Sequence, residues 1–158
     1  MWPGGGTRGV WGKCRPVPEM GSAVPHKFLV IDDSPLVRTM LLDFAEELEQ
    51  DADAFGTGKE GLDAVRTGDY DLVFLDMHLP DMAGLDVLRG IRHLKPDQRV
   101  VLITSDRGDD LFAAAHDPET TVSGFINKPF TLDQFETCIR TVLTLRGTFT
   151  HRKEGYHA

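Results

Sequence analysis

Four short apolar segments limit what this chain can fold into more than any other feature of its sequence. Residues 28–31, 72–75 and 100–103 read Phe-Leu-Val-Ile, Leu-Val-Phe-Leu and Val-Val-Leu-Ile, and residues 124–127 repeat the pattern more weakly. Unbroken apolar runs of this length are typical of strands that are buried on both faces. They predict a parallel sheet with helices on both sides.

Helical periodicity and capping residues separate these strands. Ser34 followed by Pro35 is typical of a helix start, and Thr131 with Gln134 forms a capping-box pattern. Helices are predicted at 35–49, 58–67, 84–94, 109–115 and 131–146, with a further short strand at 53–55. Five strands thus alternate with five helices. The prediction is an α/β fold, an open doubly wound five-stranded parallel sheet with five helices.

Charge is distributed unevenly along the 158 residues. The net charge of the whole chain is −8. Residues 1–25 carry +2 and residues 147–158 carry +1, so residues 26–146 carry −11. Such an acidic body repels phosphate backbones and anionic lipids. We therefore expect no direct binding of nucleic acid or membrane surfaces, and a cation or a basic protein as the partner.

One domain is expected, spanning residues 26–146. Residues 1–25 contain six glycines and four prolines, which predicts a disordered leader. Residues 147–158 are expected to be a polar tail, and we expect no output domain after Arg146. The two cysteines, Cys14 and Cys138, make no metal or disulfide framework, which favours a reducing compartment. No apolar run approaches the ~20 residues of a membrane span. We expect a cytoplasmic protein.

Polar side chains follow the predicted strands at the point where each strand ends. Asp32 and Asp33 follow the first long strand, Asp76 ends the second, Thr104 follows the next, and Lys128 follows the last. The carboxyl ends of parallel strands share one edge of the sheet, where ligands bind. Three carboxylates there repel one another unless a cation compensates, and all-oxygen ligands suit Mg²⁺ or Mn²⁺.

This constellation favours phosphoryl transfer. A carboxylate beside a divalent ion can attack phosphorus, and Asp76 is placed for that role. Thr104 could donate a hydrogen bond to a phosphoryl oxygen and Lys128 could supply a point charge. Each residue also has a structural explanation: acids can cap helices or end strands, Lys128 can be solvated, and Asp81 can form a turn. Few unrelated sequences would carry all of these residues at successive strand ends in this order.

The sequence closely resembles the receiver domain of bacterial two-component response regulators of the stand-alone, single-domain type. The resemblance implies a flavodoxin-like fold. The motifs that carry the likeness are Val-Ile-Asp-Asp-Ser at 30–34, Leu-Asp-Met-His-Leu-Pro-Asp-Met-Ala-Gly at 75–84, Ile-Thr-Ser at 103–105 and Asn-Lys-Pro-Phe at 127–130. The resemblance implies that Asp76 accepts a phosphoryl group from the phosphohistidine of a sensor histidine kinase or a histidine phosphotransfer protein. It implies Mg²⁺ held directly by Asp33, mostly through water by Asp32, and by the His78 carbonyl.

The resemblance also assigns switching and lifetime roles. Phe125 and Thr104 correspond to the family's conformational switch, and the bond between Lys128 and Pro129 to its cis peptide. Phe125 could instead be a plain core aromatic. His78 and Asp106 stand where the family tunes the lifetime of its acyl phosphate. We expect self-catalysed phosphorylation and dephosphorylation, with no other enzymatic activity.

An output protein is expected to dock on the face made by the fourth helix (109–115), the fifth strand (124–127) and the fifth helix (131–146), and the same face allows a phosphorylation-dependent homodimer. Two alternatives stay open. The chain could be a receiver-like scaffold that binds partners without phosphorylation, or a Mg²⁺-dependent phosphohydrolase that uses Asp76 as its nucleophile.

Overall fold

The computed structural model describes residues 25–105 and 120–144. Its strands are β1 (Lys27–Ile31), β2 (Asp51–Phe55), β3 (Leu72–Asp76), β4 (Val100–Thr104) and β5 (Gly124–Asn127). Its helices are α2 (Pro35–Glu47), α3 (Gly58–Thr67), α4 (Gly84–Leu94) and α6 (Leu132–Thr144). The strands form one parallel sheet in the order β2-β1-β3-β4-β5, so the predicted fold class is confirmed.

The described residues contain four of the five predicted helices. The helix predicted at 109–115 lies outside the described residues, as do nearly all of the predicted leader and the whole of the predicted tail. None of the helices that the structure describes is long and apolar enough to cross a membrane.

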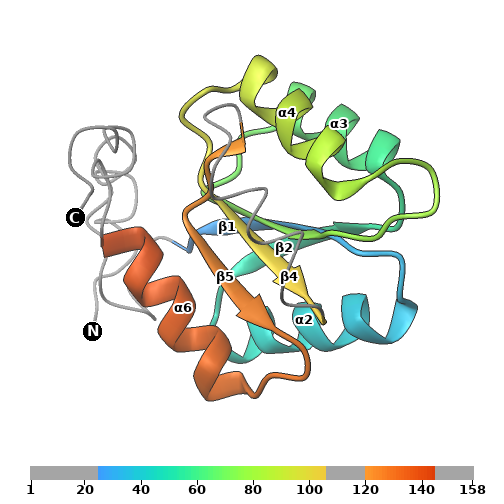
Figure 1. Ribbon diagram of the computed structural model, residues 1–158. Coiled ribbons are helices and arrows are strands. Elements are labelled where there is room, and N and C mark those ends of the chain that lie inside the picture. Colours follow the sequence, from blue (N-terminus) through green and yellow to red (C-terminus); the bar gives the residue numbers. More distant parts are fainter. Residues whose placement is uncertain (1–24, 106–119, 145–158) are drawn as a thin grey trace.

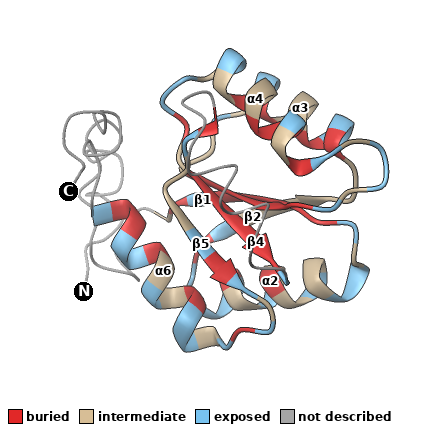
Figure 2. Cartoon of the chain, in the orientation of Figure 1, coloured by how far each residue is buried: buried red, intermediate tan, exposed pale blue. Residues whose placement is uncertain are grey.

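Within residues 25–105 and 120–144, two helices cover each face of the sheet. Figure 1 shows α3 and α4 on one face and α2 and α6 on the other. Every residue of β3 and β4 is buried, and Figure 2 shows the buried residues concentrated in the strands and on the helix sides that face them. This burial explains the unbroken apolar runs, because a central parallel strand has no solvent-facing side.

Phe135 holds α6 against the sheet. Its ring centroid lies 5.0 Å from that of Phe74, 5.5 Å from that of Phe44 and 6.5 Å from that of Phe28. Phe130, in the loop before α6, stacks on it at 6.3 Å. Offset and edge contacts of this kind contribute to stability beyond their buried area. This cluster of five rings therefore fixes the loop that follows β5.

The structure confirms the helix caps at the two helix starts for which the sequence predicted capping residues. Ser34 Oγ accepts a hydrogen bond from Val37 N, and Thr131 and Gln134 bond each other's backbone amides reciprocally. Helix α2 ends at Glu47, two residues before the predicted end, because Glu49 adopts a left-handed φ of 61°.

Strand β2 begins at Asp51, two residues before the predicted start. The register pairs Lys27 with Asp51, so the length of the neighbouring strand β1 sets where β2 starts. Because residues 51 and 53 are both aspartates, the sequence has no apolar run there that would predict where this strand begins.

Candidate functional site

Strand pairing brings the predicted site residues to one edge of the sheet. Ile31 lies beside Leu75 in the register of β1 and β3, so Asp32 follows β1 beside the end of β3 at Asp76. One carboxylate oxygen from each of Asp32, Asp33 and Asp76 lies within 4.8 Å of the others. The predicted convergence of the three acids is thus present in the fold.

Asp32 is held in place by the start of α2. Its side chain is fully buried, and its Oδ1 accepts a hydrogen bond of 2.9 Å from Ser34 N. Arg38, one turn further along α2, donates from Nη1 to the backbone oxygen of Asp32 at 2.9 Å. Asp33, in contrast, is exposed. The helix cap itself is Ser34, so neither acid is needed for that structural role.

Lys128 places its ammonium group among the acids. Its Nζ lies 3.1 Å from Asp32 Oδ2 and 3.7 Å from Asp76 Oδ2. The backbone N of Lys128 donates to the oxygen of Thr104 at 2.9 Å, and the following bond to Pro129 is cis, as predicted. The lysine is therefore fixed by the backbone of β4 and is far from being a freely solvated base.

Asp76 is a buried carboxylate in an acidic environment. Its exposed fraction is 4%. Burial chiefly, and then the charge of Asp32, raise the pKa of Asp76 to about 6, while Lys128 and a hydrogen bond from His78 N act in the opposite direction. One ammonium group therefore does not fully compensate the charge of the site.

The donor set fits a hard divalent cation. Three carboxylates share the site with one lysine, and Asp32 Oδ2 is buried with no hydrogen-bond partner among the described residues, although it forms an ion pair with Lys128. This oxygen, paired with one ammonium group, can therefore accept a further positive ligand. Oxygen ligands of this kind suit ions such as Mg²⁺. The acidic cluster is therefore a candidate metal site.

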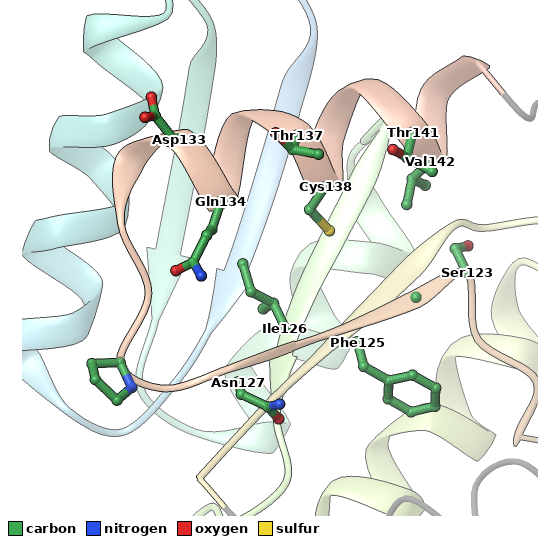
Figure 3. Close-up of a pocket in the computed structure, with 12 residues that line it drawn as sticks. Ser123, Phe125, Ile126, Asn127, Asp133, Gln134, Thr137, Cys138, Thr141 and Val142 are labelled. Atoms are coloured by element: carbon green, nitrogen blue, oxygen red, sulfur yellow. The ribbon is translucent and has the colours of Figure 1, made fainter.

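The remaining predicted residues lie around this cluster. Thr104 is buried at the end of β4, and the side chain of His78 is exposed two residues beyond Asp76. Asp106 lies outside the described residues. Phe125 has an exposed fraction of 41%, so the interpretation of it as a plain core aromatic is wrong. Alternation along β5 turns it away from α6, as Figure 3 shows.

A pocket of about 560 Å³ lies between β5 and α6. Figure 3 shows Cys138 and Gln134 of α6 directed towards the strand, beside Ile126. Burial raises the pKa of the Cys138 thiol to about 11. Cys138 is partly buried and packs against the core.

Two residues near the site were missed by sequence reasoning. Arg38 was not singled out, and Asp81 was interpreted only as a turn former. Asp81 in fact accepts hydrogen bonds from Gly58 N and Lys59 N at the start of α3. No local pattern could reveal this contact, because the partners are 22 and 23 residues apart in the chain.

Comparisons with known proteins agree with this geometry. Residues 28–140 match the family model of the response regulator receiver domain. The chain is 33% identical over 133 residues to the uncharacterized transcriptional regulatory protein YkoG of Bacillus subtilis, covering 79% of this chain and 54% of that protein. It is 32% identical over 129 residues to the probable transcriptional regulatory protein TcrX of Mycobacterium tuberculosis, covering 80% of this chain and 53% of that protein.

The chain thus spans about half the length of these curated relatives. Among solved structures, a CheY-like receiver domain protein from Methanospirillum hungatei superposes with a TM-score of 0.71 at 21% identity, covering 83% of this chain and 99% of that one. This likeness supports the fold independently of sequence. With the family model matching most of the chain, the protein belongs to the response regulator receiver domains of two-component signalling.

Proposed function

We propose that this protein is a phosphorylation-dependent switch in which Asp76 accepts a phosphoryl group from the phosphohistidine of a sensor histidine kinase or a histidine phosphotransfer protein. The observation that carries the proposal is the arrangement around Asp76. A buried carboxylate at a strand end has Lys128 Nζ at 3.7 Å and two further acids close enough to share a cation. Membership of the receiver family supports the same role.

The transfer breaks the P–N bond of the donor and forms a bond between phosphorus and a carboxylate oxygen of Asp76. A donor ring that is protonated on its other nitrogen keeps the electron pair of the P–N bond and leaves as neutral imidazole, so no further proton is needed. Asp32, Asp33, Asp76 and the backbone carbonyl of His78 would hold Mg²⁺, or Mn²⁺, which when bound neutralises charge on the transferring group. Thr104 would donate a hydrogen bond to a phosphoryl oxygen.

Lys128 has two tasks in this scheme. It lowers the pKa of Asp76 against the effects of burial and of Asp32, which keeps a larger share of the nucleophile ionised near neutral pH. After transfer, its ammonium group is already within reach of the new phosphoryl oxygens, because it lies 3.7 Å from Asp76 Oδ2.

The switch would act on partner binding through β5 and α6. Phosphorylation is expected to bias a two-state equilibrium in which Phe125 and Thr104 change position. Phe125 is partly exposed on β5, and the pocket between β5 and α6 lies on the adjoining surface. We propose a protein as the output partner, with a second copy of this chain as one form that the partner could take.

His78 and Asp106 are proposed to set the lifetime of the acyl phosphate. Asp106 would orient or repel the attacking water, and the exposed His78 side chain would shield the phosphoryl group. The variants Asp106→Ala and His78→Ala are both expected to change the dephosphorylation rate. Unchanged rates in both would contradict this part of the proposal.

Intact-mass spectrometry tests the central step. The full chain is incubated with Mg²⁺ and acetyl phosphate beside Asp76→Asn and a matched control, Asp63→Asn, which changes a half-exposed acid of α3. Wild type and Asp63→Asn should each gain one phosphoryl group, which EDTA abolishes, and Asp76→Asn should gain none. A folded, Mg²⁺-binding wild type that gains no phosphoryl group would favour the phosphorylation-independent scaffold, and steady turnover of a phosphate ester would indicate a phosphohydrolase.

A further inference from the structure

Asp81 joins the loop at 77–83, here called the acceptor loop, to the start of α3. Its Oδ1 accepts a hydrogen bond of 2.8 Å from Gly58 N and its Oδ2 one of 3.0 Å from Lys59 N. The carboxylate thus bonds two successive backbone amides at a helix N-terminus, where negative charge is favoured. The bond from Gly58 N, followed by that from Lys59 N, holds the pKa of Asp81 below its usual value.

Helix α3 also has a local cap besides Asp81. Thr57 is the N-cap residue, and its Oγ1 accepts a hydrogen bond of 3.1 Å from Glu60 N. Glu60 Oε1 in turn lies 3.2 Å from that hydroxyl. The local cap bonds Glu60 N, whereas Asp81 bonds the two preceding amides, so the Asp81 contact both extends the cap of α3 and fixes the acceptor loop.

The acceptor loop is cross-braced, so a constraint at Asp81 reaches the site. Gly84 N donates to Met77 O at 2.9 Å, and His78 and Ala83 form an antiparallel bridge across the loop. His78 N also donates to Asp76 Oδ1 at 3.3 Å. These bonds tie the two sides of the loop together, with the Asp76 carboxylate at one end and the α3 contact at the other.

Packing reinforces the same junction. A Cβ added at Gly58 would lie 2.5 Å from Cγ of Met82, so the residue after Asp81 fits closely over the first residue of α3. Close packing by itself fixes only the distance between the loop and α3. The two hydrogen bonds of Asp81 add direction, because they require the loop to face the helix N-terminus.

We propose that Asp81 is a positioning residue that, by anchoring the acceptor loop to α3, holds the His78 carbonyl and the Asp76 carboxylate in the arrangement that binds the divalent ion. The inference rests on the proposed function, since it concerns the metal used there. Asp81 acts through the loop, because its described bonds go to α3 and none goes to the acidic cluster. Its loss should weaken metal binding more than it weakens the fold.

The test compares the full-length wild type with Asp81→Ala, Asp81→Asn and Thr57→Ala. Mg²⁺ alone is titrated calorimetrically, amide hydrogen exchange is followed at His78 and Gly84, and thermal unfolding is measured in EDTA. Asp81→Ala should weaken Mg²⁺ affinity about tenfold, in the range found for residues that orient metal ligands. It should also speed exchange at both amides. Asp81→Asn keeps one acceptor oxygen, so its Mg²⁺ affinity and its exchange rates should lie between those of the wild type and those of Asp81→Ala.

Thr57→Ala is the matched control, because it removes a cap from the same helix without touching the acceptor loop. It should lower Tm by a few degrees yet leave Mg²⁺ affinity within about twofold of wild type. Equal loss of affinity in Thr57→Ala and Asp81→Ala would overturn the inference, as would wild-type affinity in Asp81→Ala.

The same experiment separates this inference from the proposed function. If wild type binds Mg²⁺ and Asp81→Ala binds it equally well, only the positioning role of Asp81 fails. If wild type binds no Mg²⁺, the proposed metal-dependent function is overturned together with the metal half of this inference. The exchange rates at His78 and Gly84 then decide whether Asp81 anchors the loop.

Discussion

Replacing Asp76 by Asn should stabilise the metal-free protein at neutral pH. Burial and the neighbouring charge of Asp32 raise the pKa of Asp76 from an ordinary 3.8 to about 6. A carboxyl group with that change in pKa costs about 3 kcal/mol when it is charged in the folded state. Because solvent reaches the rim of the site at the exposed Asp33, we expect a gain of ~2 kcal/mol.

The pH dependence of this gain follows from its sign. The folded protein binds the Asp76 proton more tightly than the unfolded chain does, so the wild type loses stability relative to Asp76→Asn as pH rises from about 4 to about 6. Below about 4 the carboxyl group is neutral in both states, and the difference between the two proteins should disappear. Above about 6 it should be constant.

Urea unfolding in EDTA measures the effect, at pH 7.5 and again near pH 4. Asp63→Asn is a suitable control, because its carboxylate is half exposed and pairs with Arg66 on the surface of α3. That variant should differ from wild type by less than about 0.5 kcal/mol at either pH. An Asp76→Asn protein no more stable than wild type at pH 7.5 would refute the view that charge at Asp76 is costly in this fold.

Three further outcomes are expected. Phe135→Ala should lower the free energy of unfolding by about 3–5 kcal/mol in urea titrations, because it removes a buried ring that contacts four others, and a loss below 1 kcal/mol would contradict that packing. Gly84→Ala should lower Tm, because its Cβ would lie 2.6 Å from Met77 Cα, a backbone atom that cannot move aside; an unchanged Tm would show that the loop yields. In a Cys14→Ser background, the Cys138 thiol should resist iodoacetamide at pH 8 until urea unfolds the protein, since burial raises its pKa to about 11, and rapid labelling of the folded protein would contradict this.

The positioning role proposed for Asp81 implies that the site depends on contacts of the acceptor loop as well as on the strand ends. The acids of the cluster come from strand ends, and strands in a packed sheet are rigid. The acceptor loop is different, because it supplies the His78 carbonyl from irregular backbone. A loop carries such a group accurately only when other contacts over-determine its position. Asp81, the bridge at His78 and the close approach at Gly84 provide those contacts.

Sequence alone determined the sheet and its functional edge. The buried strands β1, β3 and β4 were predicted within one residue because continuous apolar runs have one favourable environment, a sheet covered on both faces. The meeting of the three acids with Lys128 followed, since parallel strands end at the same edge. The caps at Ser34 and Thr131 were also readable, because their partners lie three residues away.

Only the tertiary structure decided the contacts between distant segments. The attachment of Asp81 to α3 and the partial exposure of Phe125 depend on which elements become neighbours, and no local pattern encodes that. The pKa of Asp76 has the same origin, because it reflects the burial and charges that the assembled fold places around one carboxylate. Local propensities and periodicity specify elements and their order, whereas distances between side chains far apart in sequence are fixed only when those elements pack.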